Sequence, residues 1–365
     1  MALNVQQNVL LAPYTTLQIG GAADYLCEVS STKELVAACQ LALLTGKPPL
    51  ILGGGSNLLI NDHGYRGWVL LMKNKGVSLQ TDTSSKETLV RAAAGEDWDT
   101  LVEYTVEQGL CGLENLSGIP GTVGAAPVQN INAYGATVAD KITSVEVYDY
   151  VNDKVLIFSK TECQFGYRDS IFKQAAGASL IVTAVTFSLA PADKANLAYR
   201  SASQSIEHYL KEIGITEPTP LQVRAAVLEA RRNIGMLLGQ FNSAGSFFKN
   251  TVVSAAVFTQ VEAVVMEKYA ELSSRLSPWH WTLNTGEVKI STAFLMECSP
   301  FNKHTYGDNR WHQVVGISPR HSLSIVTYAG ATASDVVSFV EEIVAAIESI
   351  FNLTIESEVN IIFEK

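Results

Sequence analysis

The chain has 365 residues, of which 47% are hydrophobic and 17% charged, a composition typical of packed globular domains rather than of disordered proteins. This length exceeds one ordinary domain, so two or three are expected. The formal net charge of −10 argues against a nucleic-acid-binding surface, although an acidic protein can still hold a local basic cleft for an anionic substrate.

Nothing in the sequence predicts a membrane segment or a metal site. No run reaches the roughly 18 apolar residues that cross a bilayer. The first residues, Met1 to Gln7, lack the basic and apolar regions of a signal peptide, so we expect a cytoplasmic protein that binds no membrane. Five scattered cysteines without a Cys-x-x-Cys pair indicate reduced, mostly buried thiols, and the six histidines form no metal-binding pattern.

The first half of the chain predicts a mixture of helices and strands. Ser31–Glu34 is a capping-box pattern, which predicts a helix that continues to about Leu44. A short buried strand is expected at 49–52, and a second helix at 100–108, which Gly109 ends. A long loop follows at 118–135, and two strands rich in β-branched residues are expected at 143–150 and 180–189. This half is therefore α+β, without the regular alternation of a doubly wound sheet.

The second half predicts helices before a mixed region. Residues 191–246 are expected to be mostly helical, with 223–230 the clearest segment. Apolar residues recur at helical spacing from 334 to 351, which predicts a long amphipathic helix. Residues 354–363 predict a final strand, with Ile355, Val359, Ile361 and Phe363 on one face and Glu356, Glu358 and Asn360 on the other.

Two glycine-rich segments favour a dinucleotide ligand. Residues 53–58 (GGGSNL) match neither the Gly-x-Gly-x-x-Gly nor the Walker A pattern, and alone they fit a plain tight turn. Three glycines after a strand can also direct backbone N–H groups at a phosphate. A second loop, 115–126 (NLSGIPGTVGAA), lets a flat ligand approach its backbone, and 129–135 (QNINAYG) adds amides and an aromatic ring. Together the segments fit a pyrophosphate at one loop and a ring system at the other.

Five ordered motifs carry a resemblance to a known family. They are LGGGSNLL at 52–59, LENLSGIPGTVGAAP at 113–127, FGYRDSIFK at 165–173, AGSFFKN at 244–250 and IESEV at 355–359. In order and spacing they resemble the UDP-N-acetylenolpyruvoylglucosamine reductases, over nearly the whole chain. The match thins at about 200–228, 255–285 and 299–316. The segment near Tyr199 and the extra length before Ser246 resemble the family's type I form.

The resemblance implies the fold, the cofactors and the reaction. It implies an α+β fold. An FAD-binding region of the vanillyl-alcohol-oxidase/PCMH type is expected in two subdomains, at 1–72 and 73–230. A C-terminal α+β substrate-binding domain is expected at 231–351, and a terminal strand that returns to the FAD-binding site at 352–365. NADPH is the implied hydride donor and UDP-N-acetylglucosamine enolpyruvate the implied acceptor, in peptidoglycan precursor synthesis. We expect a monomer whose only partner is this small-molecule substrate.

The resemblance also implies three catalytic residues. The reaction adds a hydride to C3 of an enol ether and a proton to C2 beside a carboxylate, so the site needs hydrogen-bond donors or positive charge and a positioned acid. Ser246 matches the family's proton donor, Arg168 its catalytic arginine and Glu358 its third catalytic residue. The alternatives are a plain loop serine, a surface pair between Arg168 and Asp169, and Glu356 in place of Glu358.

The other implied site residues contact the cofactor or the substrate. The expected cofactor contacts lie in the glycine loops and one later helix: Gly53, Gly54, Gly55, Ser56, Asn57, Leu58, Ser117, Gly118, Pro120, Gly121, Gly124, Ala125, Gln129, Asn130, Tyr134 and Arg231. The expected substrate contacts are Tyr134, Tyr199, Lys249, Asn250 and His321.

One departure from the family pattern concerns the substrate. Ile234 stands where the family usually has a lysine, which puts substrate affinity in doubt more than the redox chemistry. Lys249, Arg232 and Arg320 are candidates to replace the missing charge.

Two other functions remain open. One is a related flavoprotein that oxidises small alcohols or sugars, a class that often links FAD covalently to a histidine. Residues 53–62 contain no His or Cys, although His63 follows directly. The other is a binding protein that keeps the fold without turnover.

Overall fold

The computed structural model describes residues 3–81, 87–191, 206–306 and 310–362, and the chain divides into two compact units. Unit 1 is Met1–Leu10, Ala22–Gly55 and Tyr65–Asn233, and unit 2 is Leu11–Gly21, Ser56–Gly64 and Ile234–Lys365. The chain therefore passes from unit 1 into unit 2 directly after Gly55, inside the first glycine motif. The domain boundaries predicted at residues 72 and 230 stay predictions.

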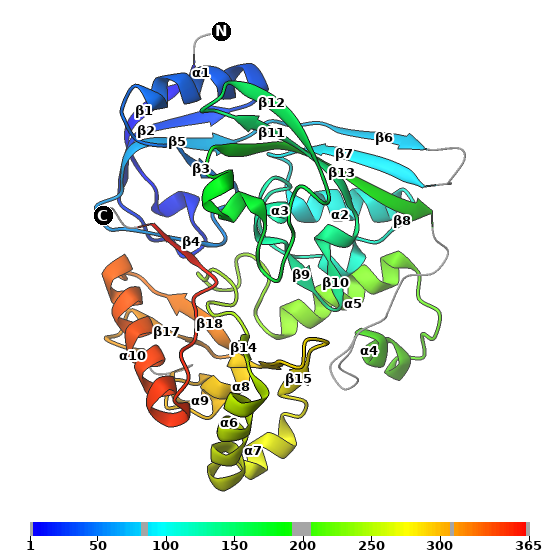
Figure 1. Ribbon diagram of the computed structural model, residues 1–365, viewed down its shortest axis with the longest axis vertical. Coiled ribbons are helices and arrows are strands. Elements are labelled where there is room, and N and C mark those ends of the chain that lie inside the picture. The colour runs from blue at the N-terminus through cyan, green and yellow to red at the C-terminus, as the bar shows by residue number, and fades with distance from the viewer. Residues whose placement is uncertain (1–2, 82–86, 192–205, 307–309, 363–365) are drawn as a thin grey trace. The chain divides into compact units, whose positions relative to one another are not determined.

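The first sheet of unit 1 has four strands in the order β1-β2-β5-β3, with bounds Val5–Leu10, Ala22–Val29, Tyr65–Met72 and Leu50–Leu52. Strand β5 pairs in parallel with β2 and β3, and β1 is antiparallel to β2. Helix α1 (Thr32–Leu43) packs on β2 and β5 (Figure 1). Ser31 Oγ accepts the N–H of Glu34, which confirms the predicted helix start, and the predicted strand at 49–52 is confirmed as β3.

The second sheet is antiparallel throughout, with the strand order β12-β11-β13-β7-β6 and with β8 beside β13. In that order the strands have the bounds Lys154–Ser159, Ile142–Asp149, Leu180–Pro191, Thr88–Ala93 and Val77–Thr81, and β8 is Leu110–Cys111. Strands β11 and β13 confirm two predicted strands. Helix α2 (Trp98–Glu107) begins two residues before its predicted start, because Asp97 Oδ1 accepts the N–H of Thr100. It ends before Gly109, which has φ +69°, as predicted.

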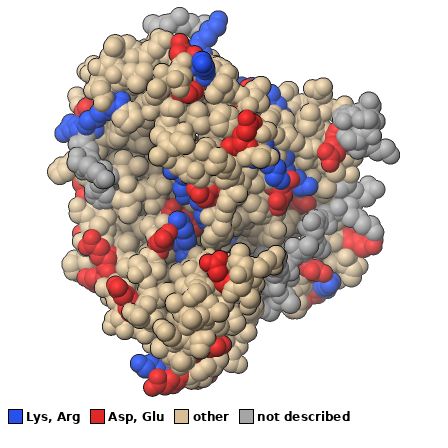
Figure 2. Space-filling model, viewed as in Figure 1, with Lys and Arg blue, Asp and Glu red and all other residues tan. Residues whose placement is uncertain are grey.

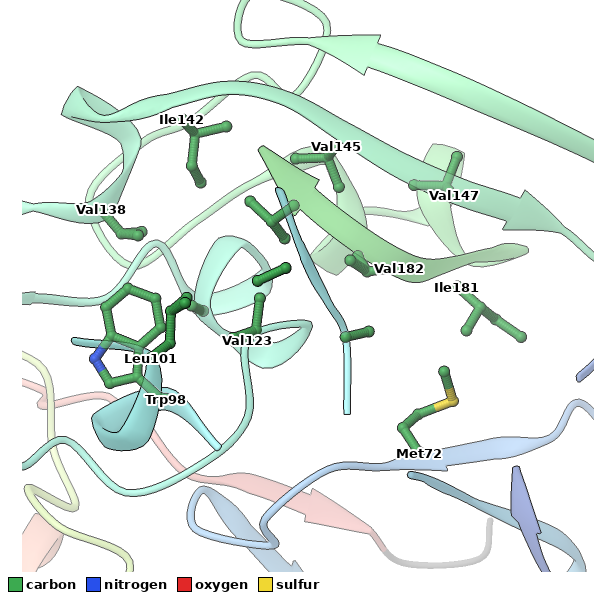
Figure 3. Packing of buried hydrophobic residues seen from close by; sticks show 14 of the residues in the cluster. Met72, Trp98, Leu101, Val123, Val138, Ile142, Val145, Val147, Ile181 and Val182 are labelled. Carbon is green, nitrogen blue, oxygen red and sulfur yellow. The ribbon is translucent and has the colours of Figure 1, made fainter. Parts of the chain in front are cut away.

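One hydrophobic core serves both sheets of unit 1. It joins Met72 of the first sheet to Val145, Val147 and Ile181 of the second, and Trp98 and Leu101 of α2 point into it (Figure 3).

All five cysteines are free thiols and four are buried, as predicted. Burial raises the pKa of Cys39 to about 12.

The predicted long loop at 118–135 is wrong in part. It contains helix α3 (Ala125–Gln129) and strand β9 (Asn132–Ala133), which pairs with β10 (Ala136–Thr137). Pro127 is the third residue of α3, where a backbone N–H has no partner within the helix, so proline is tolerated. Asn130 ends the helix in the left-handed conformation, with φ 44°.

The prediction of a mostly helical stretch at 191–246 is also wrong in part. Helices α4 (Ile206–Glu212) and α5 (Pro220–Asn233) confirm it, but residues 234–246 form neither helix nor extended strand. Gly235, Gly239 and Gly245 all have positive φ angles, which explains why the helix does not continue. Residues 192–205, including Tyr199, lie outside the described part of the chain.

Unit 2 combines small sheets with helices. Its sheets are β14-β16-β15, β17-β18 and β4-β19, at Thr251–Val253, Val288–Ile290, His280–Thr282, Val315–Ser318, His321–Thr327, Leu58–Ile60 and Asn360–Ile362. Its helices are α6 to α10, at Ala255–Lys268, Ala270–Arg275, Thr292–Glu297, Lys303–Tyr306 and Ala333–Phe351. Among the single-turn 3-10 helices of the described residues, η1 lies in unit 2 at Ala12–Tyr14. Helices η2 to η5 lie in unit 1 at Glu114–Leu116, Val138–Asp140, Ile171–Lys173 and Ala175–Gly177.

The end of the chain confirms one prediction and corrects another. Helix α10 matches the predicted amphipathic helix, and a capping box of Thr332 and Asp335 starts it. The final strand is shorter than predicted, since residues 356–358 form an isolated bridge with 247–249 and only 360–362 join β4. Ile355 and Val359 are buried as expected, Ile361 is exposed, and Phe363 lies outside the described residues.

Within the described ranges, no helix is both long and apolar enough to be a membrane span. Basic and acidic side chains occur together in small groups on the described part of the face in Figure 2.

Candidate active site

The two glycine loops of unit 1 contact each other directly. A Cβ atom added to Gly54 would lie 2.8 Å from Gly121 Cα, and one added to Gly53 would lie 2.5 Å from Thr122 Oγ1. Both distances are shorter than real Cβ contacts, so only glycine lets the loops close on each other. The junction therefore consists of backbone and the Thr122 side chain, which fits the close approach of a pyrophosphate group such as that of FAD. Gly54 at this junction is exposed to solvent.

The second glycine loop is held along the start of α2. Trp98 N donates to Gly121 O at 3.1 Å, and Val123 N donates to Glu96 O at 2.9 Å. Ser117, predicted to contact the cofactor, is fully buried, and its hydroxyl donates to Glu114 O within the loop. Of the other predicted contacts here, Pro120 and Gly124 are half-buried and Ala125 is exposed.

Two predicted cofactor residues lie on the C-terminal end of α3, beside the hairpin that carries Arg168. Asn130 Nδ2 donates to Gly166 O at 2.7 Å. Lys173 Nζ donates to Gln129 Oε1 and to Arg168 O, each at 3.0 Å. The FGYRDSIFK motif and the QNINAYG segment are thus joined to each other in unit 1. Lys173, the last residue of the FGYRDSIFK motif, is a residue of this region that the sequence analysis did not name as a candidate.

Arg168 lies at the tip of a tight turn. Gly166 N donates to Asp169 O at 2.9 Å, and Arg168 has φ +54° between them. Its Nη1 donates to Asn132 O at 3.4 Å, and Gln174 Nε2 donates to the Asp169 carboxylate. A non-glycine residue in the left-handed region is uncommon, and such strain clusters at functional sites.

Arg231 contacts the backbone of the second glycine loop. It is buried on α5, and its Nε donates to Gly118 O at 3.0 Å. Burial lowers the pKa of Arg231, while the electrostatic effects of the nearby Tyr134 and Asp99 side chains oppose that shift. The half-buried Tyr134 has φ +45°, and its carbonyl accepts from Asn115 Nδ2.

In unit 2, three distant segments meet at Glu358. Its backbone N–H donates to Phe247 O at 2.7 Å, and its carbonyl accepts from Asn57 Nδ2 at 3.3 Å. Ser246 directly precedes Phe247 and is half-buried. The structure therefore brings together segments that carry a predicted flavin contact, the predicted proton donor and the predicted third catalytic residue.

The contacts around Glu358 extend to the end of the first motif, LGGGSNLL. Leu58 pairs with Asn360 in the parallel β4–β19 ladder, and Asn360 N donates to Asn57 O (Figure 1). Ser56 is half-buried at the start of this unit 2 segment. Phe247 N in turn donates to Leu323 O of β18, two residues after His321.

The structure distinguishes the two candidate glutamates. Glu356 is exposed, with 75% of its side chain accessible, and forms an ion pair with Lys249 at 3.1 Å. Glu358 is half-buried. The predicted substrate contacts Lys249 and Asn250 both reach α8, since Thr292 Oγ1 donates to Lys249 O and Thr292 N donates to Asn250 Oδ1.

Ile234 is half-buried and so is not part of a closed core. The next residue, Gly235, has φ +73°, and a Cβ atom there would lie 3.4 Å from Arg320 Cδ. Arg320 therefore lies next to the position of the lysine that this chain lacks. Among the described residues, no three His, Cys, Asp or Glu side chains group as a metal site would require.

Comparisons with known proteins agree with the motifs. Residues 23–159 match an FAD binding domain, and residues 238–362 match the C-terminal domain of UDP-N-acetylenolpyruvoylglucosamine reductase. The enzyme of that name from Thermobifida fusca is 38% identical, over 98% of each chain. The one from Pseudomonas fluorescens is 34% identical, over 99% of each chain.

A solved structure gives the same result. The crystal structure of UDP-N-acetylenolpyruvylglucosamine reductase from Thermus caldophilus superposes with a TM-score of 0.63 at 26% identity, covering 99% of each chain. The expected α+β fold with an FAD-binding region and a separate C-terminal domain is confirmed. The chain belongs to the UDP-N-acetylenolpyruvoylglucosamine reductase family.

Proposed function

We propose that the chain reduces UDP-N-acetylglucosamine enolpyruvate to UDP-N-acetylmuramate for peptidoglycan synthesis, with NADPH as reductant and FAD as cofactor. Bound at the glycine loops, FAD supplies the hydride chemistry. The observation that carries the proposal is the meeting of the segments of Asn57, Ser246 and Glu358 in unit 2. No local feature of the sequence requires these three segments to meet, whereas a proton-transfer site does.

Each catalytic residue has a role that its chemistry suits. The planar guanidinium of Arg168 can bind the substrate carboxylate in a bidentate way and stabilise the developing enolate. Ser246 supplies the proton to C2. A serine hydroxyl is a weak acid, so its alkoxide needs a stabilising neighbour or a proton relay. Glu358, one residue beyond Ser357 in the bridge to 247–249, is the group we assign to that relay.

The test of this function is NADPH oxidation by the purified yellow protein. Oxidation should require the enolpyruvyl sugar nucleotide, and small alcohols or free sugars should neither replace it nor reduce the flavin. Reduction of the flavin by such an alcohol or sugar would favour the alternative oxidase. A protein that stays colourless after incubation with FAD would favour the binding protein without turnover.

FAD should bind noncovalently. The junction of residues 53–54 with 121–122 is made of backbone and a threonine, with no thiol or imidazole to form a covalent bond. Acid precipitation should therefore release all flavin into the supernatant, as measured by its absorbance. Flavin that stays with the pellet would show a covalent link, with His63 the first residue to examine.

Ile234→Lys should lower KM for the sugar nucleotide, or leave it unchanged, with little effect on kcat. A uridine diphosphate sugar with a carboxylate is strongly anionic, and a half-buried position allows a lysine to extend to solvent. An exposed charge contact contributes about 0.2–1 kcal/mol, so KM should fall by about fivefold at most. A contact made equally in the ground and transition states changes KM and not kcat.

Ile234→Met is the matched neutral control for that variant and should behave like the wild type. Thermal unfolding is measured in parallel. A large loss of stability in Ile234→Lys without a lower KM would show that position 234 does not face the substrate.

Two broader expectations from the sequence remain proposals, namely a cytoplasmic location and a monomeric state. Light scattering of the FAD-loaded protein at micromolar concentration checks the second, and a mass of twice the 39.4 kDa chain would contradict it.

A further inference from the structure

Gly118 is held at both of its backbone polar atoms by charged side chains of unit 1. Its N–H donates to Asp99 Oδ1 at 2.6 Å, and its carbonyl accepts from Arg231 Nε at 3.0 Å. Gly118 has φ +68°, a conformation that favours glycine. Three residues later, Gly121 contacts Gly54. The two charged contacts therefore fix the start of the turn that reaches the junction of the glycine loops.

Asp99 is itself oriented by an arginine from a different helix. Arg224 Nη1 and Nη2 donate to Asp99 Oδ1 and Oδ2 at 2.6 and 2.9 Å, and Arg224 is only 6% exposed. A bidentate pair of this kind fixes the direction of the carboxylate as well as its position. Burial would raise the pKa of Asp99, but the hydrogen bonds from Arg224 and Gly118 and the charge of Arg224 lower it below its usual value. Asp99 is therefore a carboxylate at neutral pH and can accept from both donors.

The two arginines lie on one face of α5. Arg224 and Arg231 are seven residues apart, which is about two helical turns. Helices α4 and α5 pack on each other through a small core of their own, which is separate from the main core of unit 1 and contains Ile206, Leu210, Val223, Ala226 and Val227. The contacts of Asp99, Arg224 and Arg231 thus connect this helix pair to α2 and to the second glycine loop.

We propose that Asp99 and Arg224 are positioning residues for the cofactor: Arg224 orients the Asp99 carboxylate, which holds Gly118 and so places the glycine loop for FAD. This inference rests on the proposed function in that it takes the glycine loops as the FAD site. Neither residue lies in the five motifs that identify the family, and 125 positions separate them in the sequence.

Asp99→Asn tests the proposal in the full-length chain. The substitution keeps the size of the side chain but removes its charge and replaces one accepting oxygen by an amide NH2 group. The bidentate pair with Arg224 is therefore broken, and the remaining hydrogen bonds lose their charge assistance. We expect the Kd of FAD to rise by about tenfold or more, measured by fluorescence titration of protein freed of flavin. Glu103→Gln is the matched control. Glu103 pairs with the same arginine at 3.4 Å but lies one turn further along α2. The Kd of FAD for Glu103→Gln should therefore stay within about twofold of the wild type.

Two further readouts separate positioning from a general loss of stability. At saturating FAD, the visible circular dichroism of the flavin should change in Asp99→Asn and stay unchanged in Glu103→Gln. Urea unfolding of the flavin-free variants measures their free energy of unfolding separately from FAD binding. A wild-type Kd and spectrum in Asp99→Asn would overturn the proposal, as would equal losses in both variants.

A second variant covers the case in which Asp99→Asn does not fold. Arg224→Gln leaves the carboxylate in place without its bidentate partner, and the Kd should again rise, whereas an unchanged Kd would overturn the proposal. If the wild type itself binds no FAD, the proposed function fails instead, so the two failures can be told apart.

Discussion

Ser246→Ala should leave reduction of the bound flavin by NADPH unchanged and slow its reoxidation by the enolpyruvyl substrate by about 10²–10⁴-fold, the usual contribution of a positioned general acid. Ser246 is assigned to proton delivery, which occurs only in the second half-reaction. The substitution removes one oxygen from a half-buried side chain and should not disturb the bridge between 247–249 and 356–358. Rapid mixing without oxygen measures the two half-reactions separately.

Ser243→Ala is the matched control for this experiment. Ser243 is also half-buried, lies three residues earlier in the same segment, and pairs through its backbone with Val326. Both half-reactions should stay at wild-type rates in the control. Equal slowing of the two half-reactions in Ser246→Ala would point to a structural serine.

Glu358→Gln should lower kcat by about 10²–10⁴-fold, whereas Glu356→Gln should change it by only a few-fold. The two glutamates are two residues apart, and the sequence favours Glu358 by its place in the IESEV motif, with Glu356 as the alternative. The side chain of Glu356 is 75% exposed and paired with Lys249, and exposed pairs of this kind contribute little. Glu358 is half-buried, and its backbone N–H and C=O groups form hydrogen bonds with Phe247 O and Asn57 Nδ2.

Steady-state rates of both variants at saturating substrate decide between the glutamates. A large loss in Glu356→Gln with a near-normal Glu358→Gln would reverse the assignment. Thermal unfolding checks that neither variant is merely less folded.

Helix α10 was the element that the sequence predicted best. Its apolar residues repeat at helical spacing over five turns, and Val336, Val340, Ile343 and Ile347 are buried as that pattern requires. Its start is fixed locally by Thr332 and Asp335. The periodicity and the capping of such a helix are local in the sequence, so the sequence alone indicates where the helix lies.

Strand β5 shows what the sequence reasoning missed although a signal was present. Tyr65–Met72 contains an uninterrupted apolar run, WVLLM, which is typical of a parallel strand buried on both faces. Strand β1 (VQQNVL) offers no such signal, because its pattern follows neither the strand nor the helix period. Its place at the edge of the sheet depends on pairing with β2.

The motifs supply the candidate site residues, but they do not supply the contacts between distant segments of the chain. The motifs gave Ser246, Arg168 and the glycine loops as candidates. They did not give the bond from Asn57 to Glu358, which joins residues 301 positions apart, or the pair of Asp99 and Arg224. No local periodicity encodes such contacts, since they follow from the fold of the whole unit.

The most direct test of the central claim is a single turnover without oxygen. The FAD-loaded protein is reduced with one equivalent of NADPH, freed of NADP⁺, and mixed with the enolpyruvyl sugar nucleotide. We expect the absorbance of oxidised flavin to return fully, with one product formed per flavin that carries two more hydrogen atoms than the substrate. Flavin that stays reduced until oxygen is admitted, with the nucleotide unchanged, would contradict the proposed reaction.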